Sequence, residues 1–442
     1  MKDPLERYPL EVRQIARGLA GLVVVFIALA VTNPNLAGTV GVLFFFFVVM
    51  IGLHELGHFV MAKRAGMKVT EFFIGFGPRL WSFRRGDTEY GVKALPLGGY
   101  CKIIGMTNLE DIDPADEPRT YRAKGWWARV STVAAGPVTH FALALLFAYA
   151  ILVGSGDVRR GEISLQIDEV VAAIPGVNAD GTALDEQDMV ATPASGSDLR
   201  VGDLIVERDG ERVTDWVALT DYFRAHAGEQ VELTVMRAER RVTVDLEIMR
   251  AYGNDTSGVV THEPFKGAVQ RGFVGLGPKF EVPSVGVVEG VWRAPLRTWQ
   301  AGVDTAGALA HIFSPAGISD YLSNFSDDRR DEQASETRFV SPVGFGNVAS
   351  DAVRAGWVTV FALLLSINLF VGILNLVPLL PFDGGHIAVA TYEAIASKIR
   401  GRQVRADFNR LLPVMVATLS VLAFIFLSSL VLDIANPIDT NF

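Results

Sequence analysis

Hydrophobic residues in this sequence gather in long runs that are separated by polar stretches. An apolar run of about 20 residues is long enough to cross the hydrocarbon core of a bilayer as a helix. The pattern therefore predicts an α-helical polytopic membrane protein with about five spans, the first of which also suits a signal-anchor. The expected segments are residues 1–33, 34–64, 129–154, 356–386 and 411–433.

The first of these segments allows two interpretations. Basic residues precede an apolar run from Gly18 to Val31, an order that suits either a cleaved signal peptide or a retained first span. The turn-like residues from Asn33 to Gly38 lead directly into the next apolar run, which favours the retained span. Both interpretations place the start of that next run outside the cell.

The polar stretches predict two regions that are rich in β-structure. Residues 65–128 combine alternating apolar positions with turn-forming glycines, so we expect a β-rich element lying against the membrane. Residues 155–270 contain strand patterns with Gly202 and Asp209-Gly210 at strand ends, where such residues form turns. We expect a separate soluble domain there.

The segment 271–355 is expected to be a linker between this domain and the next span. Its residues 289–313 have apolar positions at helical spacing, which suits either a helix on the membrane surface or a helix packed against the soluble domain. Residues 319–338 are rich in charge and serine, and we expect them to be flexible. A short tail, residues 434–442, follows the last span.

Basic residues mark one side of the membrane at each crossing. Lys63 and Arg64 end the second apolar run, and Arg400 lies in a loop predicted for residues 387–410. Cytoplasmic segments carry an excess of Lys and Arg. Residues 65–128 and 387–410 should therefore be cytoplasmic, whereas the soluble domain and the C-terminus should be outside.

Composition narrows the range of functions. The chain has 442 residues, of which 50% are hydrophobic, and its mean hydropathy is +0.30, which is too apolar for one ordinary soluble domain. A formal net charge of −9 and the lack of a basic stripe argue against nucleic-acid binding. The single cysteine, Cys101, excludes an intrachain disulfide and a Cys-based metal site. Any metal must be bound by His and carboxylate side chains.

The most informative motif, HELGH at residues 54–58, lies within the second apolar run. Residues four apart lie on one face of a helix, so His54 and His58 can bind one metal ion with Glu55 beside them. This HExxH pattern is typical of zinc sites in which the Glu is the general base. Ionisable residues at membrane depth are costly, so a purely structural role for all three is the weaker interpretation.

A second motif, NLVPLLPFDGGH at residues 375–386, offers a third metal ligand. Its two prolines must break the helix close to Asp383, at the membrane depth expected for HELGH. Catalytic zinc needs three protein ligands and an open position. We predict that Asp383 is the third ligand of Zn²⁺, with His386 as its competitor. Asn375 is a candidate for holding the substrate backbone, and a hydrogen bond between helices is its simpler role.

His140 is a further polar residue within an apolar run. A hydrogen bond between helices is its simplest role, and direct ligation of the zinc is the alternative. Asn368, in the run that ends before Asp383, also suits an interhelical hydrogen bond.

Together these motifs resemble those of the site-2 proteases, which are intramembrane zinc metalloproteases, and most closely the regulator-of-sigma-E-protease type of actinobacteria. The resemblance extends from about residue 36 to the last span. It rests on HELGH at 54–58, GFGP at 75–78, PLGGY at 96–100, AGP at 135–137, a PDZ-like stretch at 162–252 and NLVPLLPFDGGH at 375–386.

This resemblance implies zinc ligands at His54, His58 and Asp383, a water-activating base at Glu55, and substrate handling at Asn375. It also implies an extracytoplasmic PDZ domain in residues 155–270, with the active site toward the cytoplasmic side of the inner membrane. The implied substrates are single-pass membrane proteins such as anti-sigma factors, trimmed beforehand by another protease, in regulated intramembrane proteolysis.

The chain departs from the family pattern at His140, where Asn is usual, at Phe382, where Leu is usual, and in its extra N-terminal run. Two other function classes fit parts of the sequence. A transporter could use the same ionisable residues as an ion path, but it should show inverted repeats, and the apolar runs do not pair in that way. A catalytically silent PDZ scaffold would have no need for Glu55.

Overall fold

The computed structural model describes residues 31, 34–107, 110–176, 189–253, 260–264, 268–323 and 341–435. The chain divides into two compact units, each treated by itself below. One unit consists of Met1–Gly154 with Gly286–Phe442, and the other is Ser155–Val285.

Within the described residues, four helices of the first unit are long and apolar enough to cross a membrane. Each corresponds to a span predicted from hydropathy, whereas the N-terminal segment 1–33 lies almost entirely outside the described residues. The four helices are α2 (Pro34–Arg64), α3 (Trp126–Ser155), α8 (Trp357–Leu376) and α10 (Phe408–Ala435).

A long antiparallel hairpin of β1 (Val69–Arg85) and β2 (Thr88–Ile103) forms the β-structure predicted between the first two of these helices. Each strand bends back on itself, so the sheet has four segments in the order 99–103, 69–76, 89–93 and 79–85. Gly75 lies at one bend with a φ of 91°, a conformation that favours glycine. Two short 3₁₀ turns, η2 (Glu117–Arg119) and η3 (Tyr121–Ala123), then lead into α3.

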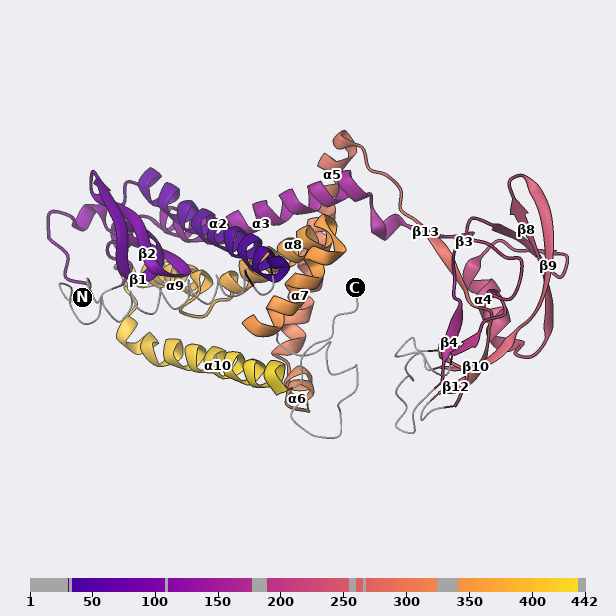
Figure 1. Ribbon diagram of the computed structural model, residues 1–442. Helices are drawn as coiled ribbons and strands as arrows, with labels where there is room; N and C mark the ends of the chain where they lie inside the picture. Colours follow the sequence, from indigo (N-terminus) through magenta and orange to yellow (C-terminus); the bar gives the residue numbers. More distant parts are fainter. Residues whose placement is uncertain are drawn as a thin grey trace, which may run out of the picture. The chain divides into compact units, whose positions relative to one another are not determined.

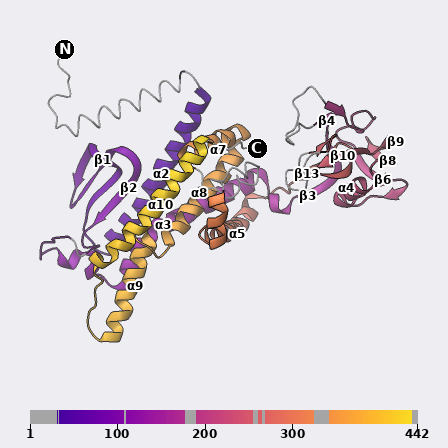
Figure 2. The same ribbon diagram turned by 90° about the horizontal axis from the view of Figure 1, so that it is seen from below.

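The hairpin packs beside α2, as both Figure 1 and Figure 2 show. Gly52 of α2 faces Ile74 of β1, since a Cβ atom at that position would be in ordinary van der Waals contact with Cδ1 of Ile74, at 3.5 Å. The HELGH turn of α2 lies just beyond Gly52, so the hairpin covers one side of that turn.

The predicted span 356–386 is divided into two helices. Helix α8 ends at Leu376, because Pro378 and Pro381, which follow it, cannot continue a helix. A non-helical segment with a cis Leu380–Pro381 bond then precedes α9 (Asp383–Arg400). A Cβ atom on Gly384 would stand 2.3 Å from the carbonyl oxygens of Leu376 and Val377. Glycine therefore lets the first turn of α9 pack directly onto the end of α8.

Residues 387–410, predicted as a loop, are thus largely helical. The buried side of α9 consists mostly of small residues, among them Ala390 and Ala396, and also includes Glu393. Such a face gives little hydropathy signal, which is why the sequence favoured a loop there.

The linker between the soluble domain and α8 is also helical, in α5 (Val287–Ile312), α6 (Pro315–Ser323) and α7 (Pro342–Ala355). Helix α5 confirms the helical spacing recognised at 289–313, and it packs against spanning helices. Its Gly290 lies against Tyr149 and Val153 of α3. Of the segment 319–338, predicted to be flexible, the part up to Ser323 completes α6 and the rest lies outside the described residues.

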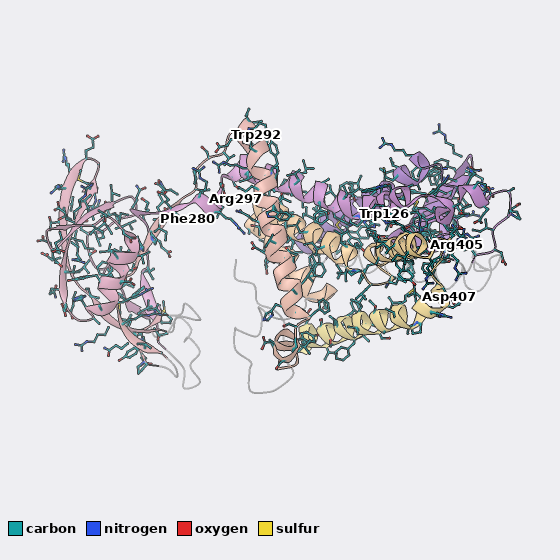
Figure 3. All side chains as sticks on the ribbon, turned by 180° about the vertical axis from the view of Figure 1, so that it is seen from behind. Trp126, Phe280, Trp292, Arg297, Arg405 and Asp407 are labelled. Atoms are coloured by element: carbon teal, nitrogen blue, oxygen red, sulfur yellow. The ribbon has the colours of Figure 1, made fainter. Side chains whose placement is uncertain are left out.

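Several basic residues of the first unit lie at one end of its helix bundle. Figure 3 shows Trp126, at the start of α3, together with Arg405 and Asp407, which precede α10, at one end of this unit, whereas Trp292 of α5 lies at the other. Ala62, in the last turn of α2, is buried in one cluster with Tyr121, and Ala128 next to the start of α3 packs against that cluster. The basic pair Lys63 and Arg64 of that turn therefore lies at the same end as Trp126.

The second unit is built around an antiparallel sheet whose strands differ in length. Its strand order is β13 (Leu276–Glu281), β3 (Glu162–Val170), β6 (Leu204–Arg208), β8 (Gln230–Arg237) and β9 (Arg240–Glu247), with β7 (Glu211–Arg212) paired to β6. Helix α4 (Trp216–Ala225) packs on this sheet through Leu219 and Phe223, which are buried with Ile205 and Leu233. The expected turn formers occur where predicted, since Gly202, Asp209 and Gly210 all have positive φ.

Smaller elements complete this unit. Strands β10 (Met249–Gly253), β11 (Val260–Thr261) and β12 (Val269–Phe273) form a second sheet, β4 (Ala173–Pro175) pairs with β5 (Met189–Ala191), and η4 (Val158–Arg160) precedes β3. The buried Asp203 accepts hydrogen bonds from Arg237 at 2.7 and 2.8 Å, which ties the turn before β6 to the end of β8.

Candidate active site

The two histidines of the HELGH motif lie on one face of α2, as the four-residue spacing predicts. Nε2 of His54 is 3.1 Å from Nε2 of His58, and their rings meet edge to face with centroids 4.7 Å apart. Both nitrogens therefore point to one position beside the helix.

Asp383 approaches the same position from the start of α9. Its Oδ2 atom lies 3.4 Å from Nε2 of His54 and 3.4 Å from Nε2 of His58. Among the described residues, these three form the group of His, Cys, Asp or Glu side chains that could hold a metal ion. The break between α8 and α9 thus brings a carboxylate to two imidazoles that are more than 300 residues away in the sequence.

The spacing of these three atoms fits tetrahedral zinc. With zinc–ligand bonds of about 2.0–2.1 Å, two ligand atoms of a tetrahedral site stand about 3.3 Å apart. The observed separations of 3.1, 3.4 and 3.4 Å are close to that value. Oδ2 of Asp383 is also buried without a hydrogen-bond partner among the described residues. A cation would compensate this oxygen.

A hydrogen bond from α3 orients His58. Nδ1 of His58 is 2.9 Å from the carbonyl oxygen of Thr132. Because a carbonyl can only accept, Nδ1 carries the proton and Nε2 keeps its lone pair for a metal. No residue pattern could have predicted this contact, since it uses a backbone carbonyl that any residue would provide.

The AGP motif of α3 explains how that helix comes so close. A Cβ atom on Gly136 would stand 2.3 Å from Nε2 of His58 and 2.7 Å from Cε1 of His54. In the same way, a Cβ atom on Gly57 would stand 2.5 Å from the carbonyl oxygen of Ala135. Glycines on both helices therefore allow α3 to lie directly against the imidazoles.

Glu55 lies next to the three-residue cluster and is covered by the hairpin. Its side chain is half-buried. A Cβ atom on Gly99 of β2 would stand 3.0 Å from Cγ of Glu55, so the PLGGY motif provides the space that this carboxylate occupies. The carboxylate is thus beside the candidate metal position without belonging to the ligand group.

The remaining candidates take different positions. His386, the competitor of Asp383, is outside the ligand group and packs its ring against Phe408 with centroids 6.0 Å apart. His140 bonds to Asn368 of α8, with Nδ1 and Oδ1 3.1 Å apart, so the predicted interhelical hydrogen bond is confirmed for both residues. Asn375 is half-buried on the last turn of α8.

A buried ion pair that sequence reasoning missed holds α9 in place. Arg129 of α3 contacts Glu393 of α9 at 2.7 Å, and both side chains are about nine-tenths buried. Glu393 also accepts a hydrogen bond of 2.6 Å from the backbone N–H of Ala406. Since Asp383 lies at the start of α9, this pair helps to set the position of the carboxylate relative to α3.

Comparison with known proteins identifies the family. The sequence profile of peptidase family M50 matches residues 42–422. The zinc metalloprotease Rip1 of Mycobacterium tuberculosis (strain H37Rv) is 33% identical over 399 residues, which cover 88% of this chain and 96% of that protein. Rip1 of Mycolicibacterium smegmatis is 32% identical over 405 residues, which cover 89% of this chain and 96% of that protein.

These matches confirm the resemblance to site-2 proteases and imply Zn²⁺ as the metal, which the His-His-Asp cluster fits. They also decide against the transporter and the silent scaffold. The chain belongs to peptidase family M50 and is a zinc-dependent protease of the site-2 type.

Proposed function

We propose that this protein cleaves single-pass membrane proteins within or near their transmembrane segments, using His54, His58 and Asp383 as zinc ligands. The observation that carries this proposal is the convergence of those three side chains between α2 and the start of α9, in a unit whose helices are long enough to span a bilayer. Placement of a metal site among such helices suits hydrolysis of a peptide bond that lies in the membrane.

Each side chain has a separate role in the proposed chemistry. When bound, Zn²⁺ supplies a Lewis acid that polarises the scissile carbonyl and makes a water molecule more acidic. Glu55 accepts the proton of the attacking water and donates it to the leaving amine. The Thr132 carbonyl keeps the proton of His58 on Nδ1, so that Nε2 remains available as a ligand.

The substrate must reach this site in an extended form, because the carbonyls of a helix are engaged in hydrogen bonds. In the described residues, the segment 99–103 pairs with β1 on one side only, and it lies beside Glu55. We propose that the substrate backbone pairs with this edge. The amide of Asn375, which can both donate and accept, would hold the substrate on the other side of the site.

We further propose that Ser155–Val285 contains a PDZ domain that acts outside the membrane as a docking module or size filter. In this unit a cavity of about 250 Å³ lies between α4 and strands β12 and β13, lined by Trp216, Phe223, Arg271 and Leu276 among others. A groove between a helix and a strand is the place where PDZ domains take extended peptides. Anti-sigma factors already trimmed by another protease are the proposed substrates, in the inner membrane.

Co-expression with candidate single-pass membrane proteins tests the proposal. Cleavage in the membrane fraction should occur with the wild-type protein and stop with Glu55→Gln. If no pre-trimmed candidate were cleaved by wild-type protein that carries zinc, the proposed substrate class would be wrong.

A further inference from the structure

The two histidines of the metal cluster are supported in different ways. Nδ1 of His58 donates to the carbonyl oxygen of Thr132. Nδ1 of His54 is buried but has no hydrogen-bond partner among the described residues. Ligating histidines usually have their second nitrogen fixed by such a partner. Within the part of the chain that the structure describes, no protein group fixes the ring of His54 through Nδ1.

His140 is the side chain placed to hold the ring of His54. It projects from α3 and is 1% exposed, and its ring contacts that of His54, with centroids 4.9 Å apart and planes inclined by 42°. On its other side, Gly372 of α8 leaves little free space, because a Cβ atom there would stand 3.1 Å from Cβ of His140. The ring is therefore confined between α8 and His54.

A chain of hydrogen bonds fixes the orientation of His140. Nδ2 of Asn368 donates to the carbonyl oxygen of Leu364 at 2.8 Å, which leaves Oδ1 of Asn368 to accept from Nδ1 of His140 at 3.1 Å. Nδ1 of His140 thus carries the proton, and Nε2 is a lone-pair nitrogen. An oriented, buried ring with one hydrogen-bonded nitrogen is a rigid support for its neighbour.

We propose that His140 is a positioning residue for the zinc ligand His54. Its ring contact gives His54 the support that His58 gains by donating a hydrogen bond to the carbonyl oxygen of Thr132. This inference rests on the ligand assignment of the proposed function. It gives His140 a role beyond linking α3 to α8, and it makes Asn368 part of the support of the metal site.

Metal binding by the full-length protein in detergent tests the inference without any substrate. His140→Asn is the informative variant, since a short amide can still bond to Asn368 but removes the ring from His54. We expect thermal unfolding of the metal-free variant to stay near that of the wild type. Zinc affinity, measured against a competing chelator, should fall by about 10-fold or more, and the visible spectrum of the Co²⁺-loaded form should shift.

Two further variants complete the design. Asn368→Ala should weaken zinc binding in the same direction, because the ring of His140 loses its anchor, and Val138→Ala should not, since Val138 is 59% exposed on the same helix. Wild-type zinc affinity with an unchanged Co²⁺ spectrum in His140→Asn would overturn the inference. Because no substrate is involved, that result is independent of whether the protein cleaves the substrates proposed above.

Discussion

Gly136 of α3 and His58 of α2 are so close that a Cβ atom added to the glycine would stand 2.3 Å from the Nε2 atom of the histidine. The same atom would stand 2.7 Å from Cε1 of His54. Helix α3 therefore forms one wall of the metal site, and a hydrogen atom is the largest side chain that this wall tolerates.

Gly136→Ala should consequently lower zinc content and proteolysis together. The added methyl group must displace the imidazoles or the helix, and such overpacking costs about 1–3 kcal/mol of stability. Zinc per protein, measured by mass spectrometry after purification, is the direct readout. Gly307→Ala in α5 is the matched control, because no heavy atom lies within 4 Å of the Cβ position there. Full zinc loading of Gly136→Ala would show that the helices can separate without disturbing the ligands.

The assignment of the third ligand predicts opposite behaviour for two nearby residues. Asp383→Ala should lose zinc, because Oδ2 is one of three atoms that converge on the metal position. His386→Ala should retain zinc, because the ring packs against Phe408 outside that group. Zinc content and cleavage activity of both variants decide the matter. The reverse pattern would make His386 the third ligand.

Glu55→Gln should abolish peptide-bond cleavage while leaving zinc binding intact. The amide is nearly isosteric with the carboxylate and still fits beside Gly99, so zinc should remain at about one ion per protein. Proton transfer by a positioned base contributes roughly 10²–10⁴-fold to a rate, so cleavage should become hard to detect. Loss of zinc in this variant would instead indicate that Glu55 is itself a ligand.

The sequence was sufficient to predict which three side chains meet, because they are rare residues in an unusual setting. His54, His58 and Glu55 are conspicuous within an apolar run, and the charge pattern placed Asp383 at the same depth. Hydropathy likewise located the four described spanning helices, since their length follows from the thickness of the bilayer. The structure confirms that the three predicted ligand side chains meet.

Other parts of the site could not be read from the sequence, for identifiable reasons. The support of His58 comes from the backbone carbonyl of Thr132, which any residue would supply. Helix α9 was predicted as a loop because its buried face is made of small residues, and because Glu393 looks solvent-exposed until its partner Arg129 is known. The contact of His140 with His54 requires knowledge of how α3 crosses α2, which no local pattern encodes.

The only cysteine should be nearly unreactive in the folded protein. Burial, together with the negative charge of Glu55 nearby, raises the pKa of the Cys101 thiol to about 12. The reactive thiolate, which dominates above pH 8.5 in an unfolded chain, is therefore scarce in the native state up to at least pH 9. Alkylation by iodoacetamide should stay slow from pH 7 to 9 and become fast in SDS, as measured by mass spectrometry. A native rate that rose with a midpoint near pH 8.5 would contradict this account.

Because Cys101 is the only cysteine, the Cys101→Ser variant has no native thiol and permits a test of sidedness with introduced cysteines. The positive-inside pattern predicts that a cysteine at Val201, which is 62% exposed, reacts with an impermeant maleimide added outside intact spheroplasts. A cysteine at Arg402, in the segment after α9, should react only after the membrane is opened. Labelling in the opposite order would invert the proposed topology.

The final prediction concerns the soluble unit, which contributes no residue to the metal cluster. The two chain segments that enter and leave it run together, since the backbone N–H of Asp157 donates to the carbonyl oxygen of Pro283 at 3.1 Å. Residues 158–282 can therefore be replaced by a short Gly-Ser linker with little strain on the first unit. We expect this variant to bind zinc and to cleave substrate that has already been trimmed.

Untrimmed substrate distinguishes a filter from a passive appendage. If the soluble unit excludes substrates with large extracytoplasmic domains, its removal should allow untrimmed substrate to be cleaved, and Glu55→Gln in the same background should abolish that cleavage. Quantitative immunoblotting of trimmed and untrimmed forms, expressed side by side, gives the comparison. Because the trimmed substrate reports that the shortened protein is active, continued resistance of the untrimmed form would rule out the filter and leave docking as the role of the unit.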